Sequence, residues 1–252
     1  MKKKIIAIAQ ARVGSTRLPG KILMPLCGEP ALKHFINRVK QSKLIDVLVI
    51  ATSTLPQDDK VEQFCLASDV ACFRGSEQDV LDRYYQASLV YKADIYVRLT
   101  ADCPLIDSNV IDDTIRHFLN STYDYVANGE SPDKGLTFPR GMDCEVFTNE
   151  LLQEAWQVAI EPYEREHVTP YMYKCHTNWA YYLNPNEVEN VAGIRLTLDT
   201  PQDYELILTI YKGLYDGTHN EFNLAKILGF LANNPDLIKI NENVIQKSVT
   251  GR

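Results

Sequence analysis

The sequence lacks the cysteine spacing that a structural zinc site or a dithiol redox motif requires. Its six cysteines are scattered, with no CxxC pair and no histidine-rich stretch beside them. Scattered thiols without an export signal suit a reducing compartment, so we expect a cytoplasmic protein. Cys103 lies beside a motif described below, and we interpret it as a small packing residue rather than a nucleophile.

Long hydrophobic runs are also missing. The apolar stretch at residues 5–9 follows three lysines, but Gln10 and Arg12 come directly after it. This stretch is too short for the apolar region of a signal peptide and predicts a buried first strand instead. No run approaches the roughly 20 residues that span a bilayer, so we expect no membrane association.

An excess of positive charge is absent as well. The chain carries 26 Lys and Arg against 33 Asp and Glu, which gives a formal net charge of −7 at pH 7. This balance argues against a broad surface for nucleic acid or anionic membrane, and we expect no nucleic-acid partner. Any anionic ligand must therefore be bound by a local cluster of cations.

The first half of the chain alternates between two kinds of segment. Apolar runs of strand length occupy residues 4–11, 46–52, 70–73 and 94–100, and segments of helical character occupy residues 30–42, 58–67, 77–91 and 107–120. This alternation predicts a three-layer α/β fold, with a mostly parallel sheet covered by helices on both faces. Ligands should bind at the carboxyl ends of the strands, where the loops after residues 11, 52, 73 and 100 converge.

The second half is less regular. Residues 128–141 are rich in Gly, Pro and charge and predict a loop or flap. We expect strands at residues 143–147, 179–183 and 193–198 and helices at residues 149–160 and 164–175, with Thr200 and Asp203 capping a last helix. Without a repeat or a low-complexity linker, the sequence predicts one domain over residues 1–252. An inserted subregion at about residues 128–190 would serve the acceptor and dimer contacts.

The first motif with chemical content is the loop after the first apolar run. It contains Arg12, Arg17 and Lys21 and no acidic residue from Gln10 to Met24. Glycines at positions 14 and 20 let the backbone approach a ligand, and the cations can bind phosphate oxygens. The loop matches neither the Walker pattern nor the dinucleotide-binding glycine fingerprint. An ordinary solvated turn is the alternative, but its place at a strand end favours a ligand loop.

Two aspartates follow predicted strands. Asp102 comes after the run at 94–100, and Asp199 comes after the run at 193–198. Carboxylates at this edge of a sheet can bind Mg²⁺ together with phosphate oxygens. Asp102 can instead cap a turn before Pro104, and Asp199 can belong to the cap of the next helix. Together with the cationic loop, the pair meets the charge requirements of a metal–triphosphate site.

A further set of polar residues is the candidate acceptor site. Asp143 and Glu145 are two residues apart and would lie on one strand face, where they can bind acceptor hydroxyls, help to bind a metal or simply face water. An arginine on the following helix can receive a carboxylate, and a nearby histidine can orient a hydroxyl, although such a histidine is more often structural. The predicted acceptor residues are Arg140, Asp143, Glu145, Arg165 and His167.

These motifs make the sequence similar to a known family. The pattern formed by Arg12, Ser15 and residues 17–21 resembles the sugar-acid cytidylyltransferases, which activate 3-deoxy-manno-octulosonate and sialic-type acids. The branch it most resembles is the cytidylyltransferase-like group of spore coat polysaccharide biosynthesis, whose patterns match residues 75–83, 99–107, 141–147, 165–171 and 198–203. The resemblance covers most of residues 4–215. One departure is Gln10, because better-studied members usually have proline there.

The resemblance implies a nucleotide-diphospho-sugar transferase fold, CTP as donor and Mg²⁺ bound by Asp102 and Asp199. It implies catalytic roles for Arg12, Arg17, Lys21 and Asp102, and a homodimer through residues near 130–185. The nucleotide-binding residues that it implies are Ala9, Ala11, Arg12, Gly14, Ser15, Lys21, Arg74, Ser76, Asp79 and Ala101.

The predicted activity is transfer of CMP from CTP to an acidic 2-keto sugar, with release of pyrophosphate, for surface polysaccharide or glycoconjugate synthesis. Another nucleotidyltransferase that uses UTP, GTP or ATP with a phosphorylated small molecule is an alternative. A glycosyltransferase would usually show a compact DxD motif, which residues 102–104 do not match. A nucleotide-binding regulatory protein without turnover also stays open.

Overall fold

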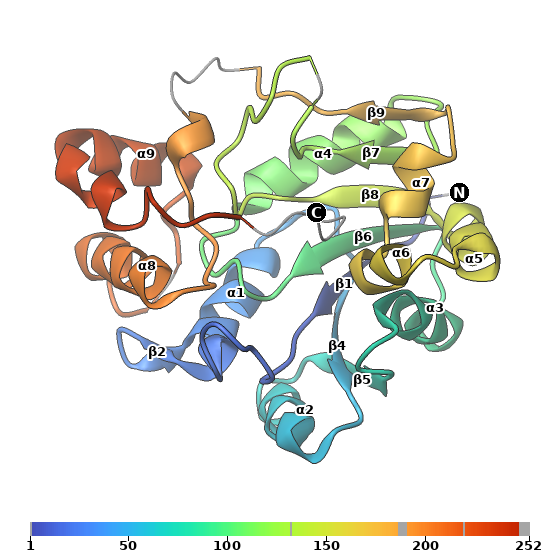
Figure 1. The fold of residues 1–252 in the computed structure, drawn as a ribbon, viewed down its shortest axis with the longest axis horizontal. Helices are drawn as coiled ribbons and strands as arrows, with labels where there is room; N and C mark the ends of the chain where they lie inside the picture. Colours follow the sequence, from blue (N-terminus) through green and yellow to red (C-terminus); the bar gives the residue numbers. More distant parts are fainter. Residues whose placement is uncertain (1, 132, 186–190, 219, 247–252) are drawn as a thin grey trace.

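The protein is described here by a computed structural model that covers residues 2–131, 133–185, 191–218 and 220–246. Its centre is a seven-stranded sheet with the strand order β5-β4-β1-β6-β8-β7-β9 (Figure 1). The strands are β1 (Ile5–Gln10), β4 (Val47–Ser53), β5 (Ala71–Gly75), β6 (Ile95–Thr100), β7 (Tyr125–Ala127), β8 (Glu145–Thr148) and β9 (Trp179–Tyr181). The predicted α/β architecture is confirmed.

The sheet is mostly parallel. β1 pairs in parallel with β4 on one side and with β6 on the other, and β5 continues the sheet beyond β4. β8 runs antiparallel to both β6 and β7. Because the chain leaves β1 in one direction and later returns to its other side, the strand order reverses between β1 and β6. Ligands of open α/β sheets bind at such a reversal, outside the carboxyl ends of the strands.

Helices cover both faces of this sheet. Alternating side chains of β1 divide the core: Ile5 and Ala7 contribute to one buried cluster, and Ile6 and Ile8 contribute to the other. The first cluster includes α1 (Ala31–Val39), α2 (Asp59–Ala67) and α4 (Ser108–Leu119). The second includes α3 (Val80–Val90), α5 (Asn149–Val158) and α7 (Pro170–Lys174), with α6 (Pro162–His167) packed against α3.

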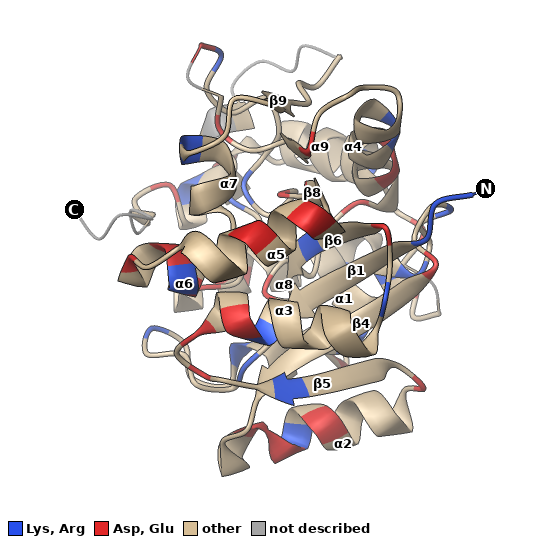
Figure 2. Cartoon of the chain, turned by 90° about the vertical axis from the view of Figure 1, so that its right-hand side faces the viewer, with Lys and Arg blue, Asp and Glu red and all other residues tan. Residues whose placement is uncertain are grey.

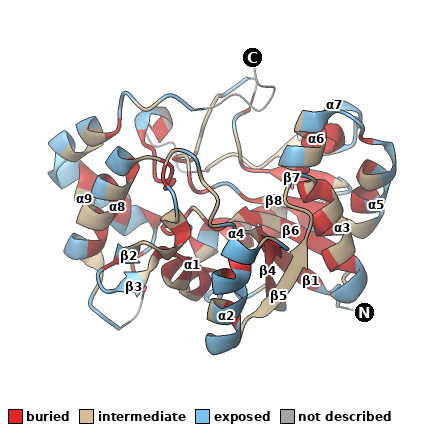
Figure 3. Cartoon of the chain, turned by 60° about the horizontal axis from the view of Figure 1, so that its bottom comes forward, coloured by how far each residue is buried: buried red, intermediate tan, exposed pale blue. Residues whose placement is uncertain are grey.

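A third buried cluster lies beside the sheet. It joins α8 (Pro201–Leu214) and α9 (Leu224–Asn233) to the short hairpin of β2 (Pro25–Leu26) and β3 (Glu29–Pro30). Two 3-10 helices lie next to these elements, η1 (Lys21–Leu23) before β2 and η4 (Pro235–Ile240) after α9. Figure 3 shows buried residues along the strands and exposed residues on the outer sides of α2, α8 and α9.

Helix caps agree with the sequence. The carboxylate of Asp107 accepts a hydrogen bond from the backbone N–H of Asn109 and is the N-cap of α4. At the start of α8, Thr200 and Asp203 form a reciprocal capping box, with Pro201 at the first helical position. These caps place the residues just before them, including Asp199, in a fixed relation to a helix end.

Three predictions about local structure are wrong. Residues 193–198 are not a strand, because Arg195 forms only an isolated bridge with Arg140 and the rest of the segment lies along loops. The helix predicted at 164–175 is broken into α6 and α7, since Val168 takes a left-handed φ of 72°. Strand β8 begins at Glu145, so Asp143 precedes it. β8 and β9, which lie in the range predicted as an inserted subregion, belong to the main sheet, and the role of that range in acceptor and dimer contacts stays a prediction.

The segment that replaces the expected strand approaches Gly141 very closely. Gly141 has a φ of +98°, and an added Cβ would lie 2.7 Å from the backbone carbonyl carbon and oxygen of Leu196. Gly141→Ala should therefore lower the free energy of unfolding by about 1–3 kcal/mol more than a change at an uncrowded position. Gly217→Ala is the matched control in denaturant titrations, because Gly217 has a φ of +89° and nothing within 4 Å. Equal losses in the two variants would contradict the close approach.

The surface charge is mixed. On the side drawn in Figure 2, α2, α3 and α6 each carry residues of both signs. Among the described residues, no helix is long and apolar enough to cross a membrane.

Candidate active site

One large cavity opens at the carboxyl ends of β1 and β6. Its volume is about 730 Å³, and it is lined by the loop after β1, by the residues that follow β6, and by segments near residues 125–145, 166–181 and 197–199. Its position is the strand-order reversal expected for a ligand site. Many of the residues that line it are charged, which suits a polar, multiply charged ligand.

The loop between β1 and η1 is closed by its own hydrogen bonds. The backbone N–H of Gly20 donates to the carbonyl of Val13 at 3.1 Å, and Gly20 has a φ of 70°. The fully buried carboxylate of Asp58, at the start of α2, accepts from the N–H of Val13 at 2.7 Å and from the hydroxyl of Ser53. Asp58 thus anchors the loop, a role that its sequence position did not indicate.

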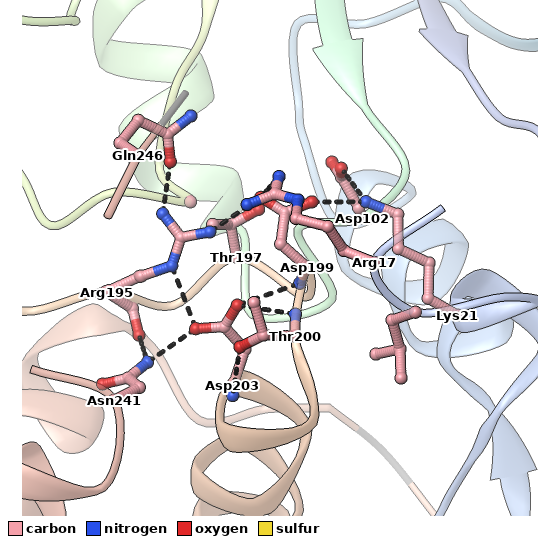
Figure 4. A network of polar contacts seen from close by, with 12 residues as sticks. Arg17, Lys21, Asp102, Arg195, Thr197, Asp199, Thr200, Asp203, Asn241 and Gln246 are labelled. Atoms are coloured by element: carbon pink, nitrogen blue, oxygen red, sulfur yellow. Dashed lines mark hydrogen bonds and ion pairs between the residues drawn. The ribbon is translucent and has the colours of Figure 1, made fainter. Parts of the chain in front are cut away.

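One loop cation, Lys21, meets both predicted metal-binding aspartates, and a second, Arg17, meets one of them. The Lys21 ammonium lies 2.6 Å from Oδ2 of Asp102 and 2.6 Å from Oδ1 of Asp199. The Arg17 guanidinium lies 3.0 Å from Oδ2 of Asp199. Arg12 lies farther out, 4.0 Å from Glu77, with its side chain 47% exposed. The structure therefore gathers Arg17, Lys21 and the two carboxylates around one point (Figure 4).

Electrostatics keep this group charged. Burial alone would lower the pKa of Lys21, but the carboxylates of Asp102 and Asp199 outweigh burial and raise that pKa. Burial would likewise raise the pKa of Asp102, but Lys21 outweighs it and lowers that pKa. Lys21 is therefore an ammonium and Asp102 a carboxylate throughout the physiological pH range.

The two aspartates reach this point differently. Asp102 follows β6 directly, as predicted. Asp199 does not end a strand; its segment is fixed by a 2.7 Å hydrogen bond from the N–H of Leu198 to the carbonyl of Asp102 and by the capping box of α8. The N-cap itself is Thr200, so Asp199 precedes the cap and its side chain is available to the cavity.

The donor set fits Mg²⁺. One ammonium contacts an oxygen of each aspartate at 2.6 Å, so the two carboxylates are close enough to share a single small cation. Mg²⁺ is usually bound by one or two carboxylates, with phosphates and water filling its other positions. In the described part of the chain, no group of three or more His, Cys, Asp or Glu side chains is placed to bind a metal by itself. This arrangement suits a metal that arrives with phosphate groups.

The predicted nucleotide-binding residues separate into two groups. Those that line the cavity are Ala11, Arg12, Gly14, Ser15 and Lys21. Ala9 and Ala101 do not line it, because both side chains are buried in the core below the sheet edge. Both side chains pack in the core, and the predicted role of these residues in nucleotide binding stays a prediction.

Arg74, Ser76 and Asp79 do not line the cavity either. Arg74 is occupied by Asp59 and Glu62, at 2.7 and 2.8 Å, and also donates to backbone carbonyls near the start of α2. The Ser76 hydroxyl accepts from the N–H of Asp79, and Asp79 caps α3. Each of these three residues has a structural partner, and its predicted role in nucleotide binding stays a prediction.

Four of the five predicted acceptor residues line the cavity, namely Arg140, Asp143, Glu145 and His167. Arg165 does not line the cavity, and the prediction that it receives an acceptor carboxylate stays a prediction. Its guanidinium contacts the carboxylate of Asp79 at 2.6–3.0 Å and the carbonyl of Trp156 at 2.8 Å. This ion pair ties α6 to α3.

Glu145 is the centre of a polar network at the acceptor end. Its carboxylate accepts hydrogen bonds from Arg98, from the hydroxyl of Tyr125 at 2.7 Å and from the hydroxyl of Thr169 at 2.6 Å. With its oxygens already occupied, Glu145 shapes this end of the cavity. Burial, with the nearby Arg98 cation, lowers the pKa of His167, so this imidazole is neutral at physiological pH.

Several cavity residues escaped the sequence analysis. Arg98 interrupts the apolar strand β6, and such an interruption is itself a signal. Arg83 is 1% exposed, and its Nε has no hydrogen-bond partner among the described residues. It lies one helical turn after the Asp79 cap, and a buried, incompletely bonded guanidinium beside a cavity favours a ligand contact. The others include Tyr125, Tyr173, Tyr181 and Gln246.

Comparison with known sequences gives long matches. Residues 6–225 match the model of a family described as "Cytidylyltransferase". The chain is 41% identical to the uncharacterized protein MJ1063 of Methanocaldococcus jannaschii, over 97% of each chain. It is 36% identical to the spore coat polysaccharide biosynthesis protein SpsF of Bacillus subtilis, over 92% of this chain and 95% of that protein.

Comparison with solved structures agrees. A cytidylyltransferase from Leptospira borgpetersenii superposes with a TM-score of 0.84 at 34% identity, covering 98% of this chain and all of that one. A CMP:2-keto-3-deoxy-manno-octonic acid synthetase complexed with CTP superposes with a TM-score of 0.61 at 18% identity, covering 83% of this chain and 99% of that one. The second likeness shows the fold alone, which is that of the nucleotide-diphospho-sugar transferases.

Proposed function

Because this chain belongs to the cytidylyltransferase family, we propose that it transfers CMP from CTP to a hydroxyl group of an acidic 2-keto sugar, releasing pyrophosphate, with Mg²⁺ as cofactor. The observation that carries this proposal is the meeting of Lys21 and Arg17 with Asp102 and Asp199 in one cavity. The product would serve the synthesis of a surface polysaccharide or glycoconjugate.

The loop after β1 would bind the triphosphate. Gly14 and Ser15 line the cavity, and Arg12 and Arg17 can turn towards phosphate oxygens. Asp102 and Asp199 would hold Mg²⁺, which neutralises phosphate charge when bound. Arg83 is available for the nucleoside, because its Nε lacks a partner among the described residues.

The acceptor would lie between Arg98 and Arg140. Tyr125, Tyr173 and Tyr181 supply flat walls. Arg140 is the arginine best placed to meet a carboxylate, since among the described residues its ion pair is with the exposed Glu130 at 3.1 Å. The named activity of the octonic acid synthetase and the role of SpsF in spore coat polysaccharide synthesis support an acidic sugar. Neutral His167 can accept a hydrogen bond from an acceptor hydroxyl.

The reaction is an in-line displacement at the α-phosphorus. The acceptor oxygen forms a bond to phosphorus, the bond to the β-phosphate oxygen breaks, and pyrophosphate leaves with the electron pair while the hydroxyl proton is released. Positioning and charge neutralisation supply most of the rate enhancement in such transfers. Lys21 and Arg17 are the protein groups that oppose the negative charge growing on the leaving pyrophosphate.

The test is an assay with purified protein, Mg²⁺, each of CTP, UTP, GTP and ATP, and a panel of acceptors that contains both 2-keto sugar acids and phosphorylated small molecules. We expect pyrophosphate release with CTP, an equal amount of CMP adduct by mass spectrometry, and loss of both signals when EDTA removes the metal. Faster turnover of another nucleotide with a phosphorylated small molecule would favour the alternative nucleotidyltransferase. Binding of CTP without turnover of any acceptor would favour a regulatory protein.

A further inference from the structure

Arg195 lies behind Asp199, outside the group of residues that line the cavity (Figure 4). It is 6% exposed, and its guanidinium makes three contacts. One nitrogen donates to Oδ2 of Asp199 at 2.7 Å, Nε donates to Oδ1 of Asp203 at 2.9 Å, and the third nitrogen donates to Oε1 of Gln246. Arg195 therefore connects the cavity to a buried carboxylate and to the C-terminal segment.

Asp203 is the fixed point of this network. Its side chain is fully buried, and each of its oxygens accepts two hydrogen bonds. Oδ1 accepts from Arg195 and from Nδ2 of Asn241, while Oδ2 accepts from the backbone N–H groups of Asp199 and Thr200 at 3.1 and 2.9 Å. A buried carboxylate with this many partners is costly to move. It fixes the backbone of Asp199 and the direction of the Arg195 guanidinium together.

The two oxygens of Asp199 consequently have different surroundings. Oδ2 faces Arg195 and Arg17, at 2.7 and 3.0 Å, whereas Oδ1 faces Lys21, which also contacts Asp102. Without Arg195, the carboxylate would be restrained by Arg17 and Lys21, the two cations that are also proposed to contact the phosphates. The contact with Arg195 determines which oxygen is presented to the point shared with Asp102.

We propose that Arg195 is a positioning residue that orients Asp199 for metal binding, and that Asn241 and Gln246 of the C-terminal segment hold Arg195 in place. The proposal rests on the proposed function, because it assigns Asp199 to the metal. In this proposal Arg195 affects the reaction only through the side chain of Asp199. Asn241 supports Arg195 from behind, since its Nδ2 also donates to the Arg195 carbonyl at 3.0 Å.

The geometry requires arginine. A planar guanidinium presents separate donors to two carboxylates and an amide at once, whereas an ammonium is a single point of charge. Lysine at position 195 keeps the buried charge balanced, but its single nitrogen cannot keep the three separate contacts with Asp199, Asp203 and Gln246 that the guanidinium makes. Arg195→Lys therefore removes the contact that orients Asp199 while it keeps the positive charge.

The experiment measures Mn²⁺ binding by electron paramagnetic resonance, with a CTP analogue that carries a methylene bridge between the α- and β-phosphates. In Arg195→Lys we expect the Mn²⁺ dissociation constant to rise about 10–100-fold, the usual range for loss of an outer partner of a metal ligand. Gln246→Ala removes one exposed hydrogen-bond partner of the Arg195 guanidinium. This variant should raise the Mn²⁺ dissociation constant by less than Arg195→Lys does. Neither measurement depends on the identity of the acceptor.

The matched control is Arg38→Lys. Arg38 is also buried, at 2% exposure, and donates to the carbonyls of Ile106 and Phe222 away from the cavity. The Arg38→Lys variant should have a lower melting temperature than the wild type and bind Mn²⁺ with unchanged affinity. Arg195→Lys that melts lower but binds Mn²⁺ as the wild type does would overturn the proposal. If that variant does not fold, unchanged binding in Gln246→Ala overturns it instead. A wild-type protein that binds no Mn²⁺ with the analogue overturns the proposed function itself.

Discussion

Asp102→Asn should lower the rate of CMP transfer by on the order of 10²-fold or more, the usual effect of losing a main electrostatic stabiliser. Asparagine has the same shape but no charge, so it weakens both metal binding and the 2.6 Å contact with Lys21. Lys21 would then pair with Asp199 alone. The measurement is steady-state pyrophosphate release at several Mg²⁺ concentrations, where we expect kcat to fall and the Mg²⁺ requirement to rise.

Asp107→Asn is the matched control for this change. Asp107 lies five positions further along the same loop, is buried, and caps α4. Asparagine is as good an N-cap as aspartate, so helix α4 should persist. Its amide cannot accept the second hydrogen bond that Asp107 takes from the backbone N–H of Leu224, so the melting temperature should fall while the activity of the folded protein stays close to that of the wild type. Near-normal turnover in Asp102→Asn would remove Asp102 from the proposed role. A comparable loss in both variants would instead indicate a general disturbance of the loop.

The sequence predicted the meeting of the loop cations with Asp102 because both follow parallel strands. Carboxyl ends of neighbouring parallel strands lie at one sheet edge, so residues after β1 and β6 must come close whatever the details of the loops. The predicted position of Asp199 at this edge is right, but the predicted strand before it is not present. Asp199 reaches the same edge through the Leu198–Asp102 backbone bond and the α8 cap, without ending a strand.

Partners of individual side chains could not be predicted in this way. Arg165 and Asp79 are 86 residues apart, and their ion pair depends on the packing of α6 against α3. Arg98 meets Glu145 because β8 turns antiparallel beside β6, a pairing that alternating hydrophobicity does not indicate. An arginine pairs with whichever carboxylate the fold brings near it. The local sequence pattern therefore located the cavity, but it did not predict which side chains pair with one another at its acceptor end.

Lys21→Met should have two effects of opposite sign. Transfer should slow by on the order of 10²-fold, because the leaving pyrophosphate loses the buried cation closest to both aspartates. In the absence of nucleotide, however, Mn²⁺ should bind more tightly than to the wild type. The Lys21 ammonium lies between the two carboxylates in the described structure, so a metal ion must compete with it for the same oxygens. Methionine has similar length and no charge.

Arg12→Met distinguishes this effect from a general loss of positive charge. Arg12 belongs to the same loop but contacts neither aspartate, and its nearest carboxylate is Glu77 at 4.0 Å. It should weaken nucleotide binding while leaving Mn²⁺ binding to the free protein unchanged. If Lys21→Met binds Mn²⁺ no better than the wild type, the ammonium and the metal do not share a position. If its transfer rate is also unchanged, the loop after β1 has no part in phosphate chemistry, because Lys21 is the cation on which that assignment depends.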